Sequence, residues 1–288
     1  TAVGLVYELR PWQWYKQLVL FVPLVFSGSA NEFDLWIRIV SGGLLFSAVA
    51  GSTYIINDVN DIDEDRQHPR KRHRPIASGQ VPVPIAVAAA IGIYIVAGVL
   101  SLQLNPLFFG LIAAYVGQNF LYSYVMKKFL FVDLLSIAIG FVLRVLAGIV
   151  LISVQLSPWL FLCTFLTALM LGVSKRWGEY ESIEEPDAVR ENLDEYSVEI
   201  LKFLFVSVAT MLLMSYSLYT FFARDIMMML TIPFAFYAVF RFAHLTLVNA
   251  GADEPVDFLF DRPMIVNLCL WGVSIVVLLY QDITEVPL

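Results

Sequence analysis

Residues 35–65 read LWIRIVSGGLLFSAVAGSTYIINDVNDIDED, an apolar stretch that ends in a run of carboxylates. About 20 apolar residues let a helix cross a bilayer, so the stretch before Asn57 predicts a membrane span. If its helix continues into the run, Asp58, Asp61 and Asp65 share one face. Three carboxylates would then lie together at the edge of a membrane.

The position of the acidic run is electrostatically unfavourable. It lies near a predicted helix C-terminus, where the helix dipole and mutual repulsion both oppose negative charge. A bound divalent cation relieves both effects. Mg2+ suits carboxylate oxygens, of which it usually takes one or two, and it completes its octahedron with water and phosphate oxygens. We therefore predict a Mg2+ site at Asp58, Asp61 and Asp65; the alternative is a solvated acidic loop.

The composition indicates a polytopic membrane protein. Of 288 residues, 59% are hydrophobic and 15% charged, and the mean hydropathy is +0.75, which is far more apolar than a soluble domain. We predict an all-α bundle that forms a single integral-membrane domain over residues 1–288, with an interfacial N-terminal segment over 1–16. The predicted spans are 17–30, 35–56, 81–103, 106–126, 130–152, 157–173, 200–222, 226–248 and 264–281.

Loop charges predict the orientation, because Lys and Arg accumulate on the cytoplasmic side. With nine spans, only Arg38 and Arg224 fall outside, whereas the other loop cations fall on one side. The N-terminus and the site are therefore expected in the cytoplasm. The functional loops on that side would be 57–80, 126–133, 174–199 and 249–262. The net charge of −7 reflects acids and bases in these same loops, so we expect no nucleic-acid partner.

Five cations follow the acidic run: Arg66, Arg70, Lys71, Arg72 and Arg74. Positive charge beside a span also orients the chain and attracts anionic lipid headgroups. Cations next to a predicted metal site nevertheless favour a phosphorylated ligand, because Arg and Lys bind the phosphate oxygens that the metal leaves. We predict that these five residues contact a substrate phosphate.

The pattern Asn57-Asp58-x-x-Asp61-x-x-x-Asp65, followed by RPIASG at 74–79, resembles the first motif of the UbiA superfamily of intramembrane prenyltransferases. The resemblance covers most of the chain. It implies a helical bundle with a polar chamber facing the cytoplasm and an opening to lipid. It also implies that the three aspartates hold Mg2+ on a donor diphosphate and that Asn57 orients a ligand.

The sequence departs from that family after the sixth predicted span. Typical members carry a second Asp-rich motif there, whereas residues 174–181 read SKRWGEYE. Lys175 and Arg176 cannot bind Mg2+, but they can bind a phosphate directly. Membrane-edge snorkelling is the alternative for both. A donor that carries a metal-bound diphosphate and a further phosphate would use both motifs, and 5-phosphoribosyl 1-diphosphate has this layout.

One branch of the superfamily is resembled more closely. The patterns that carry this resemblance are Arg10-Pro11-x-Gln13-Trp14, the Asp-rich run with its tail His68-Pro69-x-Lys71-Arg72, Lys175-Arg176-x-x-Glu179 and Arg190-x-x-Leu193-x-x-Tyr196-Ser197. This branch moves phosphoribose from phosphoribosyl diphosphate to a polyprenyl phosphate, such as decaprenyl phosphate, for cell-wall arabinan synthesis. The resemblance implies a Mg2+-dependent transferase of the plasma membrane. Its catalytic residues would be Asp58, Asp61, Lys175 and Arg176, with Tyr196 at the substrate.

Tyr122 and Lys127 lie at the end of the predicted fourth span. A Lys there can reach the acceptor phosphate, and a Tyr hydroxyl can bond an oxygen at the chamber wall. Lys127 can also serve only to orient the chain. Both are predicted substrate-binding residues.

Arg144 and Glu179 each leave two interpretations open. Arg144 lies inside a predicted span, where an ionisable group is either functional or half of a buried interhelical ion pair. Glu179 could bind ribose hydroxyls or a second metal, or it could simply pair with Lys175 four residues earlier.

Two rival functions remain open at this stage. One is a prenyltransferase that moves a prenyl group from its diphosphate onto an aromatic ring, against which Lys175 and Arg176 argue. The other is a membrane transporter, which the clustering of motifs on one face disfavours. A homo-oligomer is compatible with either.

Overall fold

The structure is a computed structural model that describes residues 1–69, 71–181, 195–222, 226–248 and 261–280. These residues form helices and connecting turns, with no strand among them. The elements are α1 (Ala2–Glu8), the 3₁₀-helix η1 (Pro11–Phe21), α2 (Val22–Phe26), α3 (Phe33–Asn60), α4 (Ile62–Gln67), η2 (Lys71–His73), α5 (Val83–Leu104), α6 (Pro106–Tyr124), η3 (Met126–Lys128), α7 (Val132–Ile152), α8 (Pro158–Glu181), α9 (Val198–Phe222), η6 (Ile226–Thr231), α10 (Ile232–Val248) and α11 (Arg262–Tyr280).

The chain divides into two compact units. The N-terminal unit comprises Thr1–Tyr124 and Leu143–Gln155, and the C-terminal unit comprises Val125–Val142 and Leu156–Leu288. Helix α7 contributes to both.

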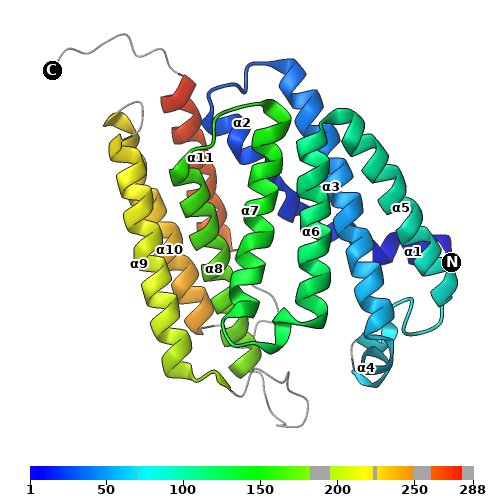
Figure 1. The fold of residues 1–288 in the computed structure, drawn as a ribbon. Helices are drawn as coiled ribbons and strands as arrows, with labels where there is room; N and C mark the ends of the chain where they lie inside the picture. Colours follow the sequence, from blue (N-terminus) through cyan, green and yellow to red (C-terminus); the bar gives the residue numbers. More distant parts are fainter. Residues whose placement is uncertain (70, 182–194, 223–225, 249–260, 281–288) are drawn as a thin grey trace. The chain divides into compact units, whose positions relative to one another are not determined.

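In the N-terminal unit, α3, α5 and α6 pack against one another, as Figure 1 shows. Their core includes Phe46 and Phe108, and it also takes in Leu20 from η1 and Leu24 from α2. The N-terminal helices are therefore part of this core rather than an appendage to it.

The contact between η1 and α7 requires a glycine. A Cβ atom added at Gly148 would lie 2.1 Å from the carbonyl oxygen of Leu20, so only a residue without a side chain lets the two backbones come this close. This close approach fixes η1 on the last turns of α7.

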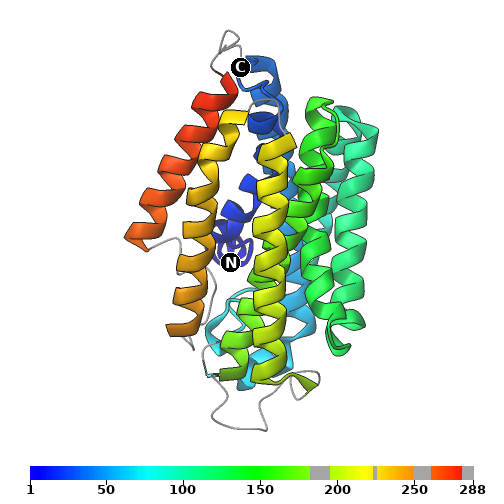
Figure 2. The same cartoon turned by 90° about the vertical axis from the view of Figure 1, so that its left-hand side faces the viewer.

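The C-terminal unit is built from α8, α9, α10 and α11, three of which, α9 to α11, run beside one another in Figure 2. Its core includes Trp177 of α8, which meets Phe205 of α9 edge-on with ring centroids 6.3 Å apart. Phe205 in turn stacks on Phe242 of α10.

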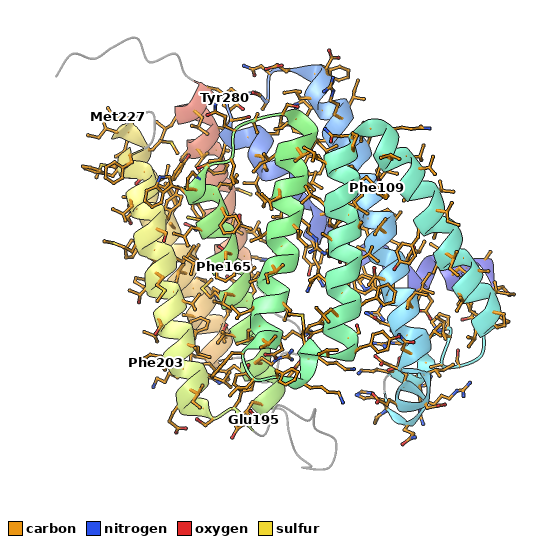
Figure 3. All side chains as sticks on the ribbon, viewed as in Figure 1. Phe109, Phe165, Glu195, Phe203, Met227 and Tyr280 are labelled. Carbon is orange, nitrogen blue, oxygen red and sulfur yellow. The ribbon has the colours of Figure 1, made fainter. Side chains whose placement is uncertain are left out.

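Seven helices of the described chain are long and apolar enough to cross a membrane: α3, α5, α7, α8, α9, η6 with α10, and α11. Many large apolar side chains lie on their outer surfaces. Phe203 projects outward from α9 in Figure 3, with 70% of its surface exposed. Such a surface is stable in lipid rather than in water, so the chain is an integral membrane protein.

Two predicted spans differ from the observed helices. Over 17–30 the chain forms the end of η1 followed by the short α2, and Pro23 lacks the backbone N–H that a continuous α-helix would need there. The span predicted to end at 173 continues to Glu181, so the first part of the loop expected over 174–199 is helix α8.

Candidate functional site

The acidic run bends at Asp61. Helix α3 ends at Asn60, Asp61 has φ −93° and ψ 13°, and α4 begins at Ile62. Asp58 and Asp65 are buried, whereas Asp61 is half-buried. The aspartates predicted to share one helix face thus lie on two helices and a turn.

Arg74 brings two of these aspartates together. Its Nη1 atom lies 2.9 Å from Oδ1 of Asp58 and 2.6 Å from Oδ2 of Asp65. Both carboxylates therefore converge on one cationic nitrogen. Charge-assisted hydrogen bonds of this kind are about twice as strong as neutral ones.

Arg10 is the second cation on Asp58. Its Nη2 atom donates to Oδ1 at 2.7 Å and to Oδ2 at 2.5 Å. The same guanidinium lies over the ring of Tyr54, with 4.9 Å between its central carbon and the ring centroid. We call Glu8, Arg10, Asp58, Asp65 and Arg74 the carboxylate–arginine cluster.

Glu8 completes this cluster. It is fully buried, and its Oε1 accepts a hydrogen bond of 2.9 Å from the backbone N–H of Ile76. Burial raises the pKa of the Glu8 carboxyl to about 7, and its hydrogen bond with Asp58 acts in the same direction, while the Ile76 N–H opposes both. A protonated Glu8 can donate to Asp58, which two ionised carboxylates cannot do.

Asn57 lies one residue before the cluster and contacts another helix. Its Oδ1 accepts a 3.0 Å hydrogen bond from the hydroxyl of Ser123, near the end of α6. Tyr122 beside it and Lys127 in η3 are half-buried. Ser123, which was not among the predicted site residues, is thus the α6 residue that bonds the acidic run, and the substrate contacts of Tyr122 and Lys127 stay predictions.

The basic loop does not act as a unit. Arg74 joins the cluster, whereas Arg66 donates to the Ala77 carbonyl at 3.2 Å and lies 3.5 Å from Asp63. Lys71 and Arg72 are exposed. Arg70 lies outside the described residues. The contact of these four side chains with a substrate phosphate stays a prediction.

The carboxylate–arginine cluster could hold a divalent cation that takes only one or two ligands from the protein. In the described part of the chain no group of three or more Asp, Glu, His or Cys side chains is placed to hold a metal. Mg2+, however, usually takes only one or two carboxylates, and Asp58 and Asp65 already converge on a positive charge. The donor set therefore fits Mg2+ bound by two carboxylates.

The C-terminal unit holds a second charged cluster, formed by Asp133, Arg176, Glu179 and Tyr196. Nε of Arg176 donates to Oδ2 of Asp133 at 2.6 Å, and both side chains are almost completely buried, with 1% and 0% exposed. Nη1 of Arg176 also pairs with Glu179. The hydroxyl of Tyr196 donates to Oδ1 of Asp133 at 2.9 Å and accepts from the backbone N–H of Phe131.

Tyr196 stays protonated in this cluster. Burial raises the pKa of its hydroxyl, and so does the negative charge of Asp133. The hydroxyl is therefore a reliable donor to the carboxylate. Its buried place suits the positioning of Asp133 more than direct contact with a substrate.

Lys175 and Glu179 are the accessible site candidates in residues 174–181, which stand in the place of the second Asp-rich motif. Their side chains are 45% and 30% exposed, and Nζ of Lys175 lies 3.9 Å from Oε1 of Glu179. The ion pair considered for Glu179 from its spacing is thus present, as a loose contact. Arg176, by contrast, is directed into the protein.

Arg144 lies inside α7 and is also buried. Its Nε donates to Gln17 at 2.8 Å and its Nη2 to the hydroxyl of Tyr115 at 2.9 Å. The guanidinium lies over the rings of Tyr115 and Phe46, at 4.7 and 5.5 Å. These contacts join α7 to η1, α6 and α3, so Arg144 has a packing role in the N-terminal unit whether or not it has another.

Sequence reasoning missed Glu8, Arg10 and Asp133 as members of charged clusters. Arg10 belonged to a recognised segment but was assigned to an interfacial anchor. One sequence signal was available. Each of these charged residues lies in or next to an apolar segment, and a charge inside a membrane protein is rarely left unpaired. That signal indicates pairing but does not identify the partner.

In a comparison with protein families, the model described as the UbiA prenyltransferase family matches residues 18–184, more than half of the chain. Curated relatives cover nearly the whole chain. A decaprenyl-phosphate phosphoribosyltransferase from Mycolicibacterium smegmatis is 32% identical over 93% of this chain and 90% of its own length. The enzyme of the same name from Mycobacterium tuberculosis is 31% identical over 94% and 92%.

Solved structures share the fold. A UbiA homologue from Archaeoglobus fulgidus, described as bound to GPP and Mg2+, superposes with a TM-score of 0.73 at 17% identity and covers 96% of this chain and 99% of its own. The same homologue bound to DMAPP and Mg2+ gives a TM-score of 0.72 at 16% identity. At this identity the likeness shows the fold alone.

Proposed function

Because the chain belongs to the UbiA prenyltransferase family, we propose that it transfers 5-phosphoribose from phosphoribosyl diphosphate to a polyprenyl phosphate with release of diphosphate. The observation that carries this proposal is identity of 31–32% to decaprenyl-phosphate phosphoribosyltransferases over more than nine tenths of the chain. The cations at the second motif, where a prenyl diphosphate enzyme of this family needs metal-binding acids, support it. Decaprenyl phosphate is the acceptor we infer, and cell-wall arabinan synthesis is the process that its product would serve.

The carboxylate–arginine cluster is the proposed subsite for the donor diphosphate. Asp58 and Asp65 would hold Mg2+, with Asp61 beside them, and Arg74 would move from the carboxylates to the phosphate oxygens. When bound, Mg2+ neutralises the charge that develops on the leaving diphosphate. The observed contacts support this assignment because they already bring two carboxylates and two guanidinium groups together.

Lys175 and Glu179 are the proposed contacts for the remaining polar groups of a phosphorylated sugar. Lys175 suits a phosphate monoester as a point charge. Glu179 suits vicinal hydroxyls as a bidentate acceptor. Arg176 is assigned a positioning role, because its guanidinium is buried against Asp133 and orients Glu179 from inside the protein.

The reaction we propose is a direct displacement. An oxygen of the acceptor phosphate forms the new bond to C1 of the ribose, while the bond from C1 to the diphosphate oxygen breaks and diphosphate leaves with the electron pair. The acceptor oxygen is already anionic, so no protein base or nucleophile is needed. Positioning and electrostatic stabilisation would supply most of the rate enhancement. The configuration at C1 should invert.

We further propose nine crossing segments, in which α6 and the η1–α2 segment join the seven apolar helices, with the N-terminus and both charged clusters on the cytoplasmic side. The surplus of Lys and Arg in the loops assigned to that side supports the orientation. Cysteine accessibility to a membrane-impermeant reagent in intact cells would test it. Labelling of a cysteine placed at Lys128 from outside the cell would contradict it.

The decisive experiment uses detergent-purified protein, phosphoribosyl diphosphate labelled in the ribose, and a polyprenyl phosphate, with and without Mg2+. Label should enter the organic phase only with Mg2+ and acceptor present, and Asp58→Asn should abolish the transfer. A parallel reaction with a prenyl diphosphate and an aromatic acid tests the rival chemistry. Prenylation of the acid without phosphoribosyl transfer would refute the proposal.

A further inference from the structure

The N-terminal segment reaches the carboxylates of α3 through a single side chain. Arg10 lies between α1 and η1, and its guanidinium contacts both oxygens of Asp58 and the face of Tyr54. Tyr54 and Asp58 are four residues apart on α3, so they present one face to it. The guanidinium therefore meets the carboxylate through one nitrogen, Nη2, while its central carbon lies over the ring.

The chain directly before Arg10 is fixed by close contacts. A Cβ atom added at Gly51 of α3 would lie 2.9 Å from the carbonyl oxygen of Leu9 and 3.2 Å from its Cα. Backbone thus meets backbone at the residue directly before Arg10. On α1, the carboxylate of Glu8 holds the backbone N–H of Ile76, in the loop that carries Arg74.

Arg10 adopts an unfavourable backbone conformation in order to make these contacts. Its φ is 50° and its ψ 60°, in the left-handed region that residues other than glycine rarely adopt. Such a conformation persists only where surrounding contacts determine it, and it is found most often at functional sites. Here the contact that it serves is the pair with Asp58.

We propose that Arg10 is a positioning residue of the diphosphate subsite. Its planar guanidinium fixes the orientation of the Asp58 carboxylate, so that the carboxylate faces Asp65 and the diphosphate-bound cation. This inference rests on one part of the proposed function, the binding of a diphosphate at the carboxylate–arginine cluster. A lysine keeps the charge, but its ammonium group is a single point that cannot bond Asp58 and at the same time place a planar group over Tyr54.

The test uses two variants that disturb this arrangement in different ways. Arg10→Lys removes the planar contact and keeps the charge. Gly51→Ala keeps Arg10 and forces the backbone of Leu9 to shift. The matched controls are Arg38→Lys, at an exposed arginine of α3, and Gly92→Ala, at a glycine of α5 with no atom within 4 Å of an added Cβ.

Two measurements are made on each full-length protein in detergent. The first is the Kd for inorganic diphosphate in the presence of Mg2+, which needs no turnover. The second is KM for phosphoribosyl diphosphate and for the polyprenyl phosphate. Both test variants should weaken diphosphate binding and raise the donor KM by about tenfold, with an unchanged acceptor KM, while both controls should match the wild type.

Equal diphosphate Kd values for the wild type and a folded Arg10→Lys variant would overturn the inference. If Arg10→Lys does not fold, the same result for Gly51→Ala would overturn it. Diphosphate binding that depends on Arg10 in a protein that transfers no phosphoribose would refute the proposed function and leave this inference standing.

Discussion

Arg176 donates through Nε to Asp133 at 2.6 Å, in a pair that is almost completely shielded from solvent. Removing one partner of a buried ion pair leaves an unpaired charge and costs about 3–5 kcal/mol, whereas replacing both partners with apolar groups is often neutral. The pair joins the start of α7 to the end of α8, so its loss should affect folding as well as catalysis.

We predict that Asp133→Leu and Arg176→Met each lower the stability of the protein by about 3 kcal/mol, and that the double variant recovers most of this loss. Thermal unfolding of the purified proteins in one detergent provides the measurement. The phosphoribosyl transfer of the double variant should stay low, because Glu179 has lost its buried partner. Additive losses in the double variant would show that the two side chains do not stabilise each other.

Lys175→Ala should change substrate binding and leave stability unchanged. Its side chain is 45% exposed, and its Nζ lies 3.9 Å from Oε1 of Glu179, which is a loose contact. Loss of one charged phosphate contact should raise the donor KM by about tenfold. Steady-state kinetics with Lys202→Ala, an exposed lysine of α9, provides the control. A donor KM equal to that of the wild type would assign Lys175 to the membrane edge.

Glu8 should make stability depend on pH. Its folded-state pKa of about 7 lies above its ordinary value of 4.5, so the folded protein holds this proton more tightly than the unfolded chain. The contribution of the protonated form is therefore full below about pH 4.5 and is lost as the pH rises to about 7. Glu8→Gln keeps an acceptor for the Ile76 N–H. In this variant the melting temperature should change less with pH between about 4.5 and about 7. An unchanged profile in Glu8→Gln would assign the dependence to another group.

Gly148→Ala should destabilise the N-terminal unit. The added Cβ would fall 2.1 Å from the Leu20 carbonyl oxygen, and a backbone atom cannot turn aside as a flexible side chain can. Overpacking of this kind costs roughly 1–3 kcal/mol. Gly110→Ala in α6, where nothing lies within 4 Å, is the control and should be neutral or slightly stabilising. Equal melting temperatures for the two variants would contradict the close approach of η1 and α7.

The long apolar helices could be predicted from the sequence because lipid requires a continuous apolar run and internal backbone hydrogen bonds. The spans predicted at 81–103, 130–152 and 200–222 agree closely with α5, α7 and α9. The N-terminal segment could not be predicted in this way. Its 3₁₀-helix is short and contains polar residues, and tertiary contacts determine its conformation.

The sequence indicated which types of residue form the candidate site, but it did not indicate which of them pair with one another. The spacing predicted that Asp58, Asp61 and Asp65 hold Mg2+, which stays a prediction, and it did not indicate that Arg74 bridges Asp58 and Asp65. Arg10 lies 48 positions from Asp58, and Arg176 lies 43 from Asp133. Periodicity assigns a residue to a helix face but does not identify the element that will cover it, so the burial of Arg176 became evident only from the fold.

The seating of η1 on α7 also constrains how the protein is made. Gln17 leaves the ribosome well before its hydrogen-bonding partner Arg144, which is synthesised 127 positions later. The N-terminal segment must therefore wait at the membrane until α7 has been inserted. During that interval the translocon or a chaperone would have to shield its apolar face, and only the arrival of Gly148 allows this earlier-made segment to take its final place.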